Sequence, residues 1–150
     1  MTALRALAAD GLPPGVYRWR TADPAADVRA DADAAGWSFV LLDTTDVGDK
    51  AGFLDVCATA FDLPRWFGRN WDALADSLGD RSTGRPEVVL WEGWQQLAAG
   101  DLDAFDVALQ IFAEDALSSG QLRVLLRESS ADADLLGPAL ADVRVLQTGL

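Results

Sequence analysis

Three short, continuous runs of apolar residues, separated by segments of helical periodicity, constrain the fold of this chain most strongly. The runs lie within 37–43, 88–91 and 122–127, and such runs are typical of strands buried on both faces of a sheet. Between them the pattern is helix, loop and helix, and then a further helix. Because parallel strands need crossover connections, this order predicts an α/β fold with a small parallel sheet of about three core strands packed with helices.

The helices between these runs are predicted from apolar stripes. The segment 51–61 carries such a stripe and is ended by Asp62 and Pro64. After the second strand, a longer helix begins at Asp101 and ends at Gly120, since glycine favours the left-handed turn that closes helices. Its apolar positions follow alternating steps of three and four residues: Leu102, Phe105, Leu109, Phe112 and Ala116.

Both ends of the chain are expected to add elements to this core. Residues 1–14 end in glycine and proline and predict a loose lead-in. Alternating residues predict a short strand at 15–20, and a helix is expected at 24–35, stopped by Gly36. Near the C-terminus we expect a turn of helix and an edge strand at 144–147.

The length of the chain limits its domain organisation. With 150 residues, half of them hydrophobic, it can build one domain with a substantial core and is short for two. We therefore expect a single domain at 1–150, with a core at about 38–128, an N-terminal extension at 1–37 and a C-terminal extension at 129–150.

The charge of the chain restricts its partners. Its formal net charge is −12 and its pI is near 4.1, so binding to nucleic acid backbones or to anionic membrane surfaces is disfavoured. A basic protein is the partner that this charge favours. No stretch approaches about 18 uninterrupted apolar residues, so we expect no membrane association.

The residue types that are missing restrict the chemistry. Histidine is absent and Cys57 is the only cysteine, which removes the commonest general base, the commonest metal ligand and any internal disulfide. Glycine-rich phosphate loops are absent too. We therefore expect a protein that is not an enzyme and uses no cofactor. The single cysteine suits a reducing compartment, so we expect a cytoplasmic protein, and we expect it to be a monomer when free.

The most informative segment is 63–79, LPRWFGRNWDALADSLG. Pro64 and Gly68 bracket two aromatic residues, which predicts a tight loop that presents or buries large rings. Asn70 is a typical N-cap for the helix that follows, and Gly79 is a typical stop. The helix carries an apolar stripe of Trp71, Leu74 and Leu78.

Two aspartates on this short helix are unfavourable for its stability. Asp72 and Asp76 are four residues apart, where like charges repel by about 0.2–0.5 kcal/mol, and Asp76 also lies near the negative end of the helix dipole. One interpretation is a solvated acidic face on a very acidic protein. The other is an anionic docking helix.

This segment resembles the barstar family of ribonuclease inhibitors. The resemblance rests on an ordered set of residues: Leu63, Pro64, Trp66, Phe67, Gly68, Asn70, Asp72, Ala73, Leu74 and Asp76. It covers about 38–128 and implies the barstar fold. It also implies that the loop and the following helix block the active site of a basic ribonuclease or nuclease-like toxin, with carboxylates where substrate phosphates would lie.

The resemblance assigns loop residues to the partner contact. Trp66 occupies the position of an aromatic ring that packs against the enzyme, with Phe67 beside it, and Gly68 keeps the backbone close to the partner. Asn70 matches a residue that caps the helix and can also reach the partner. Its role as a cap alone is an equal alternative, because the helix needs one in either case.

Helix residues complete the implied contact surface. Asp72 and Asp76 match two carboxylates that face the cationic nuclease site, and Glu114 matches a third acidic contact or is an ordinary surface glutamate. Two residues depart from the family pattern: Ala75 replaces a bulky aromatic contact and Arg69 replaces an acid. The predicted surface is therefore smaller and locally less negative, so the partner can differ from the familiar one.

Two other functions remain open from the sequence. The two helix aspartates, Asp72 and Asp76, could act as a carboxylate pair in metal-assisted or acid–base hydrolysis. Alternatively, the aromatic loop could serve a non-inhibitory interaction domain with another cytoplasmic protein as partner. The inhibitor is the leading hypothesis.

Overall fold

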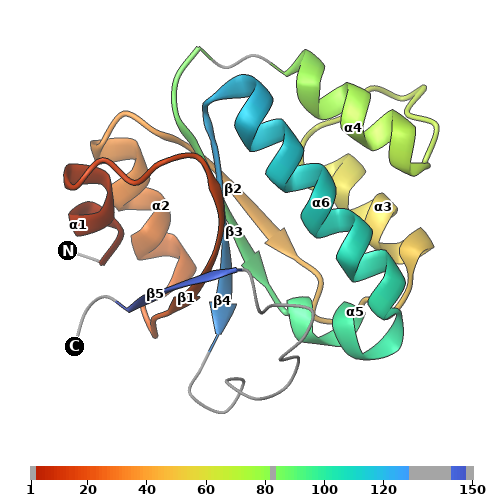
Figure 1. Cartoon of the computed structure of the whole chain (residues 1–150), viewed down its shortest axis with the longest axis horizontal. Helices are drawn as coiled ribbons and strands as arrows, with labels where there is room; N and C mark the ends of the chain where they lie inside the picture. Colours follow the sequence, from red (N-terminus) through yellow and green to blue (C-terminus); the bar gives the residue numbers. More distant parts are fainter. Residues whose placement is uncertain (1–2, 82–83, 129–142, 148–150) are drawn as a thin grey trace.

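The computed structural model describes residues 3–81, 84–128 and 143–147 (Figure 1). Its helices are α1 (Ala3–Ala9), α2 (Ala25–Ala34), α3 (Lys50–Ala60), α4 (Trp71–Asp80), α5 (Trp94–Gly100) and α6 (Leu102–Ser119). Its strands are β1 (Gly15–Arg20), β2 (Ser38–Asp43), β3 (Glu87–Glu92), β4 (Leu122–Glu128) and β5 (Arg144–Gln147).

The strands form one parallel sheet in the order β2-β3-β4-β1-β5. Four valines share one row across it, because the register pairs Val40 with Val89, Val89 with Val124, and Val124 with Val16. The parallel α/β fold predicted from the three apolar runs is confirmed. The N-terminal strand β1 lies within the sheet, between β4 and β5, which supports our proposal that 1–150 form one domain.

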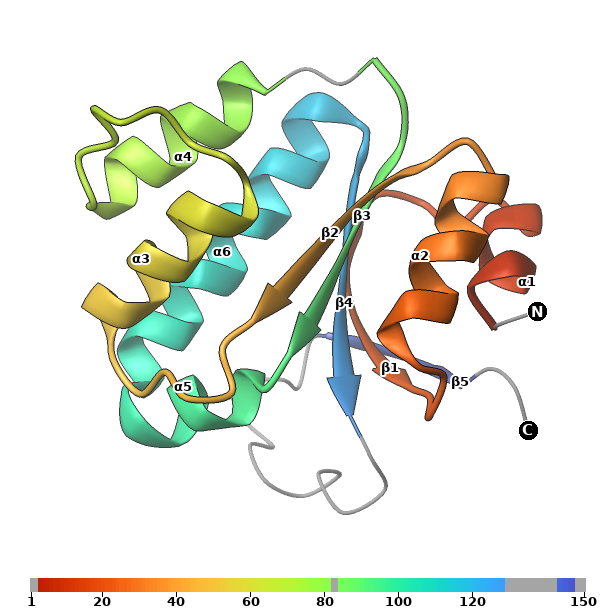
Figure 2. The same cartoon turned by 180° about the vertical axis from the view of Figure 1, so that it is seen from behind.

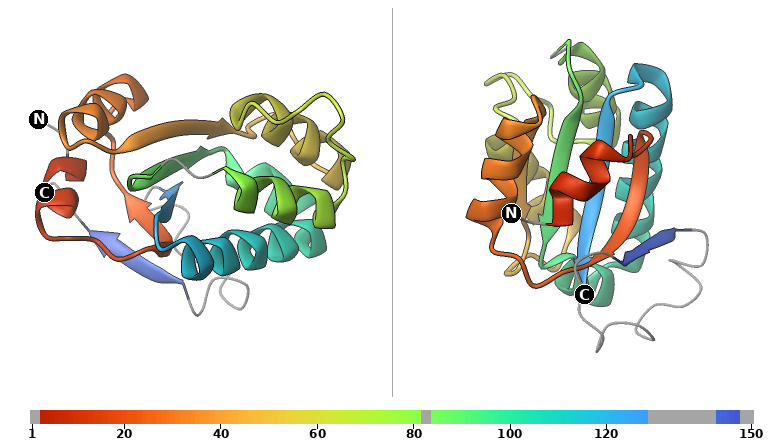
Figure 3. Two further views of the ribbon diagram at one scale, coloured as in Figure 1. Left: turned by 90° about the horizontal axis from the view of Figure 1, so that it is seen from above. Right: turned by 90° about the vertical axis from the view of Figure 1, so that its left-hand side faces the viewer.

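Helices cover both faces of the sheet (Figures 2 and 3). Because side chains alternate along a strand, Val89 and Trp91 of β3 enter the core beneath α3 to α6, while Val88 and Leu90 enter the core beneath α1 and α2. All four side chains are fully buried. Burial on both faces explains why this strand is uniformly apolar in sequence.

Three elements differ from the sequence prediction. The expected loose lead-in contains α1, whose Leu4 and Leu7 are buried, because α1 packs against α2. Gly79 does not stop its helix, since α4 continues to Asp80. The short helix α5 was not predicted; it begins after Gly93, which adopts a left-handed φ of 68°.

The C-terminal extension is described in part. The edge strand predicted at 144–147 is present as β5, which pairs with β1. The predicted turn of helix lies outside the described residues.

Buried polar groups at the ends of the strands are paired. Glu128 at the end of β4 accepts from Arg18 Nε at 2.8 Å and from Arg20 Nε at 2.7 Å, which ties β4 to its neighbour β1. The indole N–H of Trp91 donates to Thr44 Oγ1 at 2.8 Å in the interior. Thr44 in turn donates to the Gly93 carbonyl, so it links the end of β2 to the turn that follows β3.

Thr44→Val removes the acceptor of the buried Trp91 N–H while it keeps the shape of the side chain. An unpaired buried donor costs about 1–3 kcal/mol, so we expect the free energy of unfolding to fall by about this amount, measured by urea denaturation. Thr59→Val, at an exposed position of α3, is the control. Equal stability of the two variants would show that this hydrogen bond adds nothing.

Candidate partner-binding surface

The loop between α3 and α4 is tightly built by local hydrogen bonds. At the end of α3, Leu63 N–H donates to the Ala58 carbonyl at 2.9 Å and Asp62 N–H to the Thr59 carbonyl at 3.2 Å. This pair of bonds is the helix ending that normally has glycine at the left-handed position, which Asp62 occupies with a φ of 51°. The loop therefore leaves α3 in a defined direction.

The two loop aromatics point in opposite directions. Phe67 is only 6% exposed and belongs to the core beneath α3 to α6, whereas Trp66 is 84% exposed. Phe67 thus anchors the loop from inside and Trp66 presents a large apolar ring to solvent. Of the two predicted aromatic contacts, Trp66 alone has its ring at the surface.

The start of α4 is capped as the sequence predicted. Asn70 Oδ1 accepts from the Ala73 N–H at 2.8 Å, and its amide nitrogen donates to the Gly68 carbonyl at 3.3 Å. A Cβ at position 68 would lie 3.1 Å from that amide nitrogen, so glycine leaves room for the cap. Asn70 itself is exposed, which leaves its second proposed role, contact with a partner, sterically open.

Arg69 is neutralised within the molecule. Its Nε lies 2.6 Å from Asp55 Oδ1 of α3, and its left-handed φ of 47° turns the chain into α4. The sequence suggested that this arginine makes the surface locally less negative. In the structure its charge is offset by Asp55, although both side chains remain largely exposed.

The buried face of α4 determines which side chains point outward. Leu74 and Leu78 are buried, and the ring centroid of Trp71 lies 5.8 Å from that of Phe53. The exposed residues on the opposite side include the predicted contacts Asp72, Ala75 and Asp76.

One acidic residue on the exposed face of α4 was not predicted from the sequence. Asp80 is exposed and lies within α4, four residues after Asp76 and eight after Asp72, so three carboxylates follow one row of the helix. It was missed because Gly79 was taken as the helix end. The i, i+4 spacing was the signal that could have found it.

The neighbouring helix α6 contributes a further exposed edge. α4 packs alongside α6 (Figure 1), and Glu114 is exposed there, as predicted from its position off the apolar stripe. Leu117, one turn later, is 84% exposed. It was not singled out in the sequence, since an apolar residue in a helix is usually assigned to the core.

The C-terminal end of α4 is fixed to the sheet. The Arg81 guanidinium donates two hydrogen bonds to the Glu87 carboxylate, at 3.0 and 2.9 Å, and lies 4.9 Å from the ring centroid of Phe61. Asp115 of α6 lies nearby. Burial raises the pKa of Asp115, an effect opposed by the Arg81 charge and increased by that of Glu87.

Two carboxylates of α4 lie close enough in sequence to act as a pair. Asp72 and Asp76 are one helical turn apart. Across the described part of the chain, no group of three or more His, Cys, Asp and Glu side chains is placed to hold a metal ion. Among the same residues, no helix is both long enough and apolar enough to cross a membrane.

Fold and sequence together identify the family. The fold is that of an α/β domain with a parallel sheet, and it carries an exposed acidic helix. Residues 37–127 match the family described as Barstar (barnase inhibitor). Because this match spans more than half of the 150 residues, the chain belongs to the barstar family, and the resemblance seen in segment 63–79 is confirmed.

Solved structures share the fold at low sequence identity. A chain of Drosophila ORC bound to DNA is 12% identical, with a TM-score of 0.58; the match covers 97% of this chain and 28% of that one. A chain of Drosophila ORC bound to AT-rich DNA and Cdc6 is 8% identical, with a TM-score of 0.50, over 96% and 50%. The present chain thus spans half or less of these neighbours, and the likeness concerns the fold alone. No curated protein matches this chain.

Asn70→Ala removes the cap of α4 and leaves a helix N–H without its partner. We expect the free energy of unfolding to fall by about 1 kcal/mol, measured by chemical denaturation. Asn70→Asp, which keeps an acceptor oxygen, should retain most of the stability. If both substitutions cost the same, the side-chain cap is not the source of the effect.

The raised pKa of Asp115 predicts a pH-dependent stability. The folded state holds this proton more tightly than the unfolded chain, so the stabilisation is lost as pH rises from the ordinary value of 3.8 through the folded pKa. We expect Asp115→Asn to gain stability relative to the wild type as pH rises above the ordinary value of 3.8, measured by urea unfolding at each pH. Asp106→Asn, at an exposed site on α6, should show no such trend.

Proposed function

We propose that this barstar-family chain is an intracellular inhibitor or immunity protein that binds and blocks a basic ribonuclease or nuclease-like toxin. The observation that carries the proposal is the row of exposed carboxylates on α4, Asp72, Asp76 and Asp80. The family description as a barnase inhibitor supports it. In this proposal the chain is not an enzyme, needs no cofactor and acts in the cytoplasm as a monomer when free.

The rigidity of α4 is what makes its carboxylates effective. Leu74 and Leu78 anchor the helix in the core, Asn70 caps its start, and Arg81 ties its end to β3. A ribonuclease site holds phosphate with cationic side chains, and carboxylates fixed on a rigid helix offer those cations charge-assisted hydrogen bonds. Blocking such a site requires binding but no reaction.

The electrostatics of the whole chain support a basic partner. A net charge of −12 attracts a cationic enzyme over long range and speeds association in a way that salt screens. The same charge argues against a nucleic acid partner. The DNA in the ORC structures belongs to those proteins, and we do not extend it to this chain.

The aromatic residues of the surface indicate how the partner differs from the ribonuclease bound by the familiar barstar pattern. Trp66 supplies one large exposed ring in the loop before α4, while Ala75 on α4 adds no ring of its own. A partner must therefore fill the space above Ala75. We propose a nuclease with a larger side chain at this point, rather than one shaped for an inhibitor with an aromatic residue there.

The decisive experiment measures binding to a barnase-type ribonuclease and inhibition of RNA cleavage. We expect tight binding that weakens as salt rises, and Asp76→Ala should raise the Kd by at least about 30-fold, the effect of losing a hot-spot contact of about 2 kcal/mol. Asp10→Ala removes the same charge at an exposed turn after α1. It should change the Kd by less than about twofold.

Three results would separate the alternatives. Absence of binding at micromolar concentration would reject this nuclease as the partner. If a co-purifying protein still binds after charge reversal at both Asp72 and Asp76, the chain is an interaction domain that docks elsewhere. Divalent-ion binding that is lost in Asp72→Asn would favour the hydrolase instead.

A further inference from the structure

The outer strand β2 has one edge without a neighbouring strand. β3 lies on its inner side, and no described strand lies on the other. The inner pairing is visible at both ends, where Ser38 N–H donates to the Pro86 carbonyl and Thr44 N–H donates to the Glu92 carbonyl, each at 2.9 Å.

This pairing determines which backbone groups face outward. In a parallel ladder, every second residue bonds to the same neighbouring strand. Since Ser38 and Thr44 bond to β3, the backbone N–H and C=O groups of Phe39, Leu41 and Asp43 point away from it. The backbone of these three residues is a template on which a further strand can pair. Proteins usually cover such an edge or place charged side chains on it to prevent pairing.

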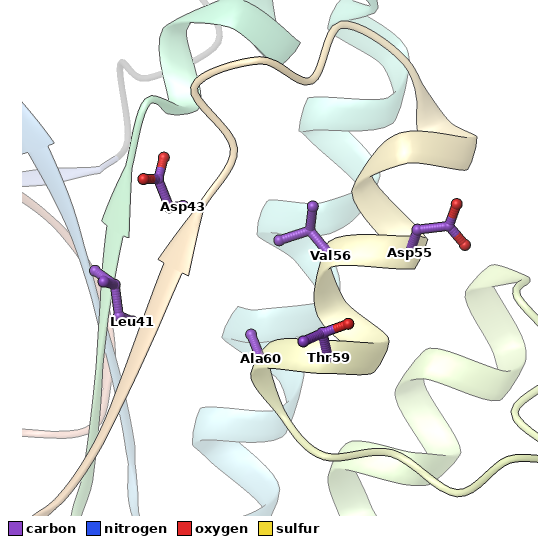
Figure 4. A pocket seen from close by; sticks show the side chains of 6 residues that line it. All are labelled: Leu41, Asp43, Asp55, Val56, Thr59 and Ala60. Carbon is purple, nitrogen blue, oxygen red and sulfur yellow. The ribbon is translucent and has the colours of Figure 1, made fainter.

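A hollow of about 450 Å³ runs between this edge and α3. Its walls include Leu41 of β2 and Val56 and Ala60 of α3, with Thr59 at its rim (Figure 4). A second hollow of about 390 Å³ continues toward the start of β2 and reaches α2 at Arg29. Seen from behind, the edge lies between α3 on one side and α2 on the other (Figure 2).

The charges along this groove differ between its two parts. The charged residues that line the first hollow are Asp43 and Asp55, both acidic. The second hollow has equal numbers of acidic and basic residues: Asp33, Asp62, Glu87, Arg29, Arg81 and Arg85. The end of the groove at Asp43 is therefore negative, and this is where a basic side chain fits best.

We propose that the outer edge of β2 is a strand-addition site for an extended segment of a partner protein that carries apolar residues flanked by a basic residue. Its main chain pairs with Phe39, Leu41 and Asp43. An apolar side chain enters the hollow against Val56, and a lysine or arginine lies at Asp43. This site goes beyond the proposed inhibitor surface on α4.

The flanking helices favour a single strand as the occupant. Residues of both α2 and α3 line the groove, so the edge is reached between two helices. The edge of a second copy would bring its own α2 and α3 against them. The net charge of −12 on each copy also opposes self-pairing.

The probe is the acetylated and amidated pentapeptide Lys-Val-Leu-Val-Lys, whose side chains read the same in both directions. Titration into the ¹⁵N-labelled full chain should shift the amide signals of Phe39, Leu41 and Asp43 in a saturable way. The peptide with glutamate at both ends should bind about two- to fivefold more weakly, as expected for the loss of one surface ion pair at Asp43. A version methylated at its backbone nitrogens should not bind.

Variants of the groove complete the test. Thr59→Trp fills the first hollow from an exposed position and should abolish binding of the lysine peptide, whereas Ala51→Trp, elsewhere on α3, should not. Asp43→Asn should weaken binding by about two- to fivefold and keeps the test decisive if Thr59→Trp does not fold. None of these variants should alter the affinity for a nuclease bound at α4.

Four outcomes would overturn the proposal. The first is equal binding of the lysine and glutamate peptides, and the second is full binding by the methylated peptide. The third is a set of shifts confined to Asp72 and Asp76, which would mean that the peptide reads the acidic face of α4. Dimers in sedimentation experiments without peptide, lost in Thr59→Trp, would instead assign the edge to a second copy of the chain.

Discussion

The indole of Trp91, on the inner strand β3, joins the layers that support the acidic helix α4. Its ring centroid lies 5.4 Å from that of Phe53 on α3 and 5.6 Å from those of Phe105 and Phe112 on α6. Its N–H is bonded to Thr44 at the end of β2. One buried side chain thus connects two strands and two helices, and aromatic contacts of this geometry contribute beyond their buried area.

The acidic helix α4 is held by this same cluster. Trp71 at its start packs against Phe53, its leucines enter the core, and the salt bridge between Arg81 and Glu87 fixes its end to β3. The outward carboxylates therefore stand on a support that does not depend on them. Because tertiary packing, and not helix propensity, stabilises α4, the helix can carry repelling carboxylates on its outer face.

The two proposed surfaces rely on different interactions. The α4 surface offers charged carboxylates, and the loop before α4 adds the exposed ring of Trp66. The β2 edge offers unpaired main-chain groups beside an apolar hollow, with two aspartates at one end. α3 contributes to both, since Asp55 neutralises Arg69 near the first and lines the second.

The sequence alone determined the parallel α/β fold, the Asn70 cap and the outward row of Asp72 and Asp76, because periodicity and capping depend on residues within about four positions of one another. The tertiary structure decided which of the adjacent rings Trp66 and Phe67 is buried. It also decided that α1 packs against α2 and that α4 extends past Gly79. It also decided the strand order, which puts β1 inside the sheet and leaves β2 at an edge. These features depend on contacts between residues far apart in the chain, which local patterns do not contain.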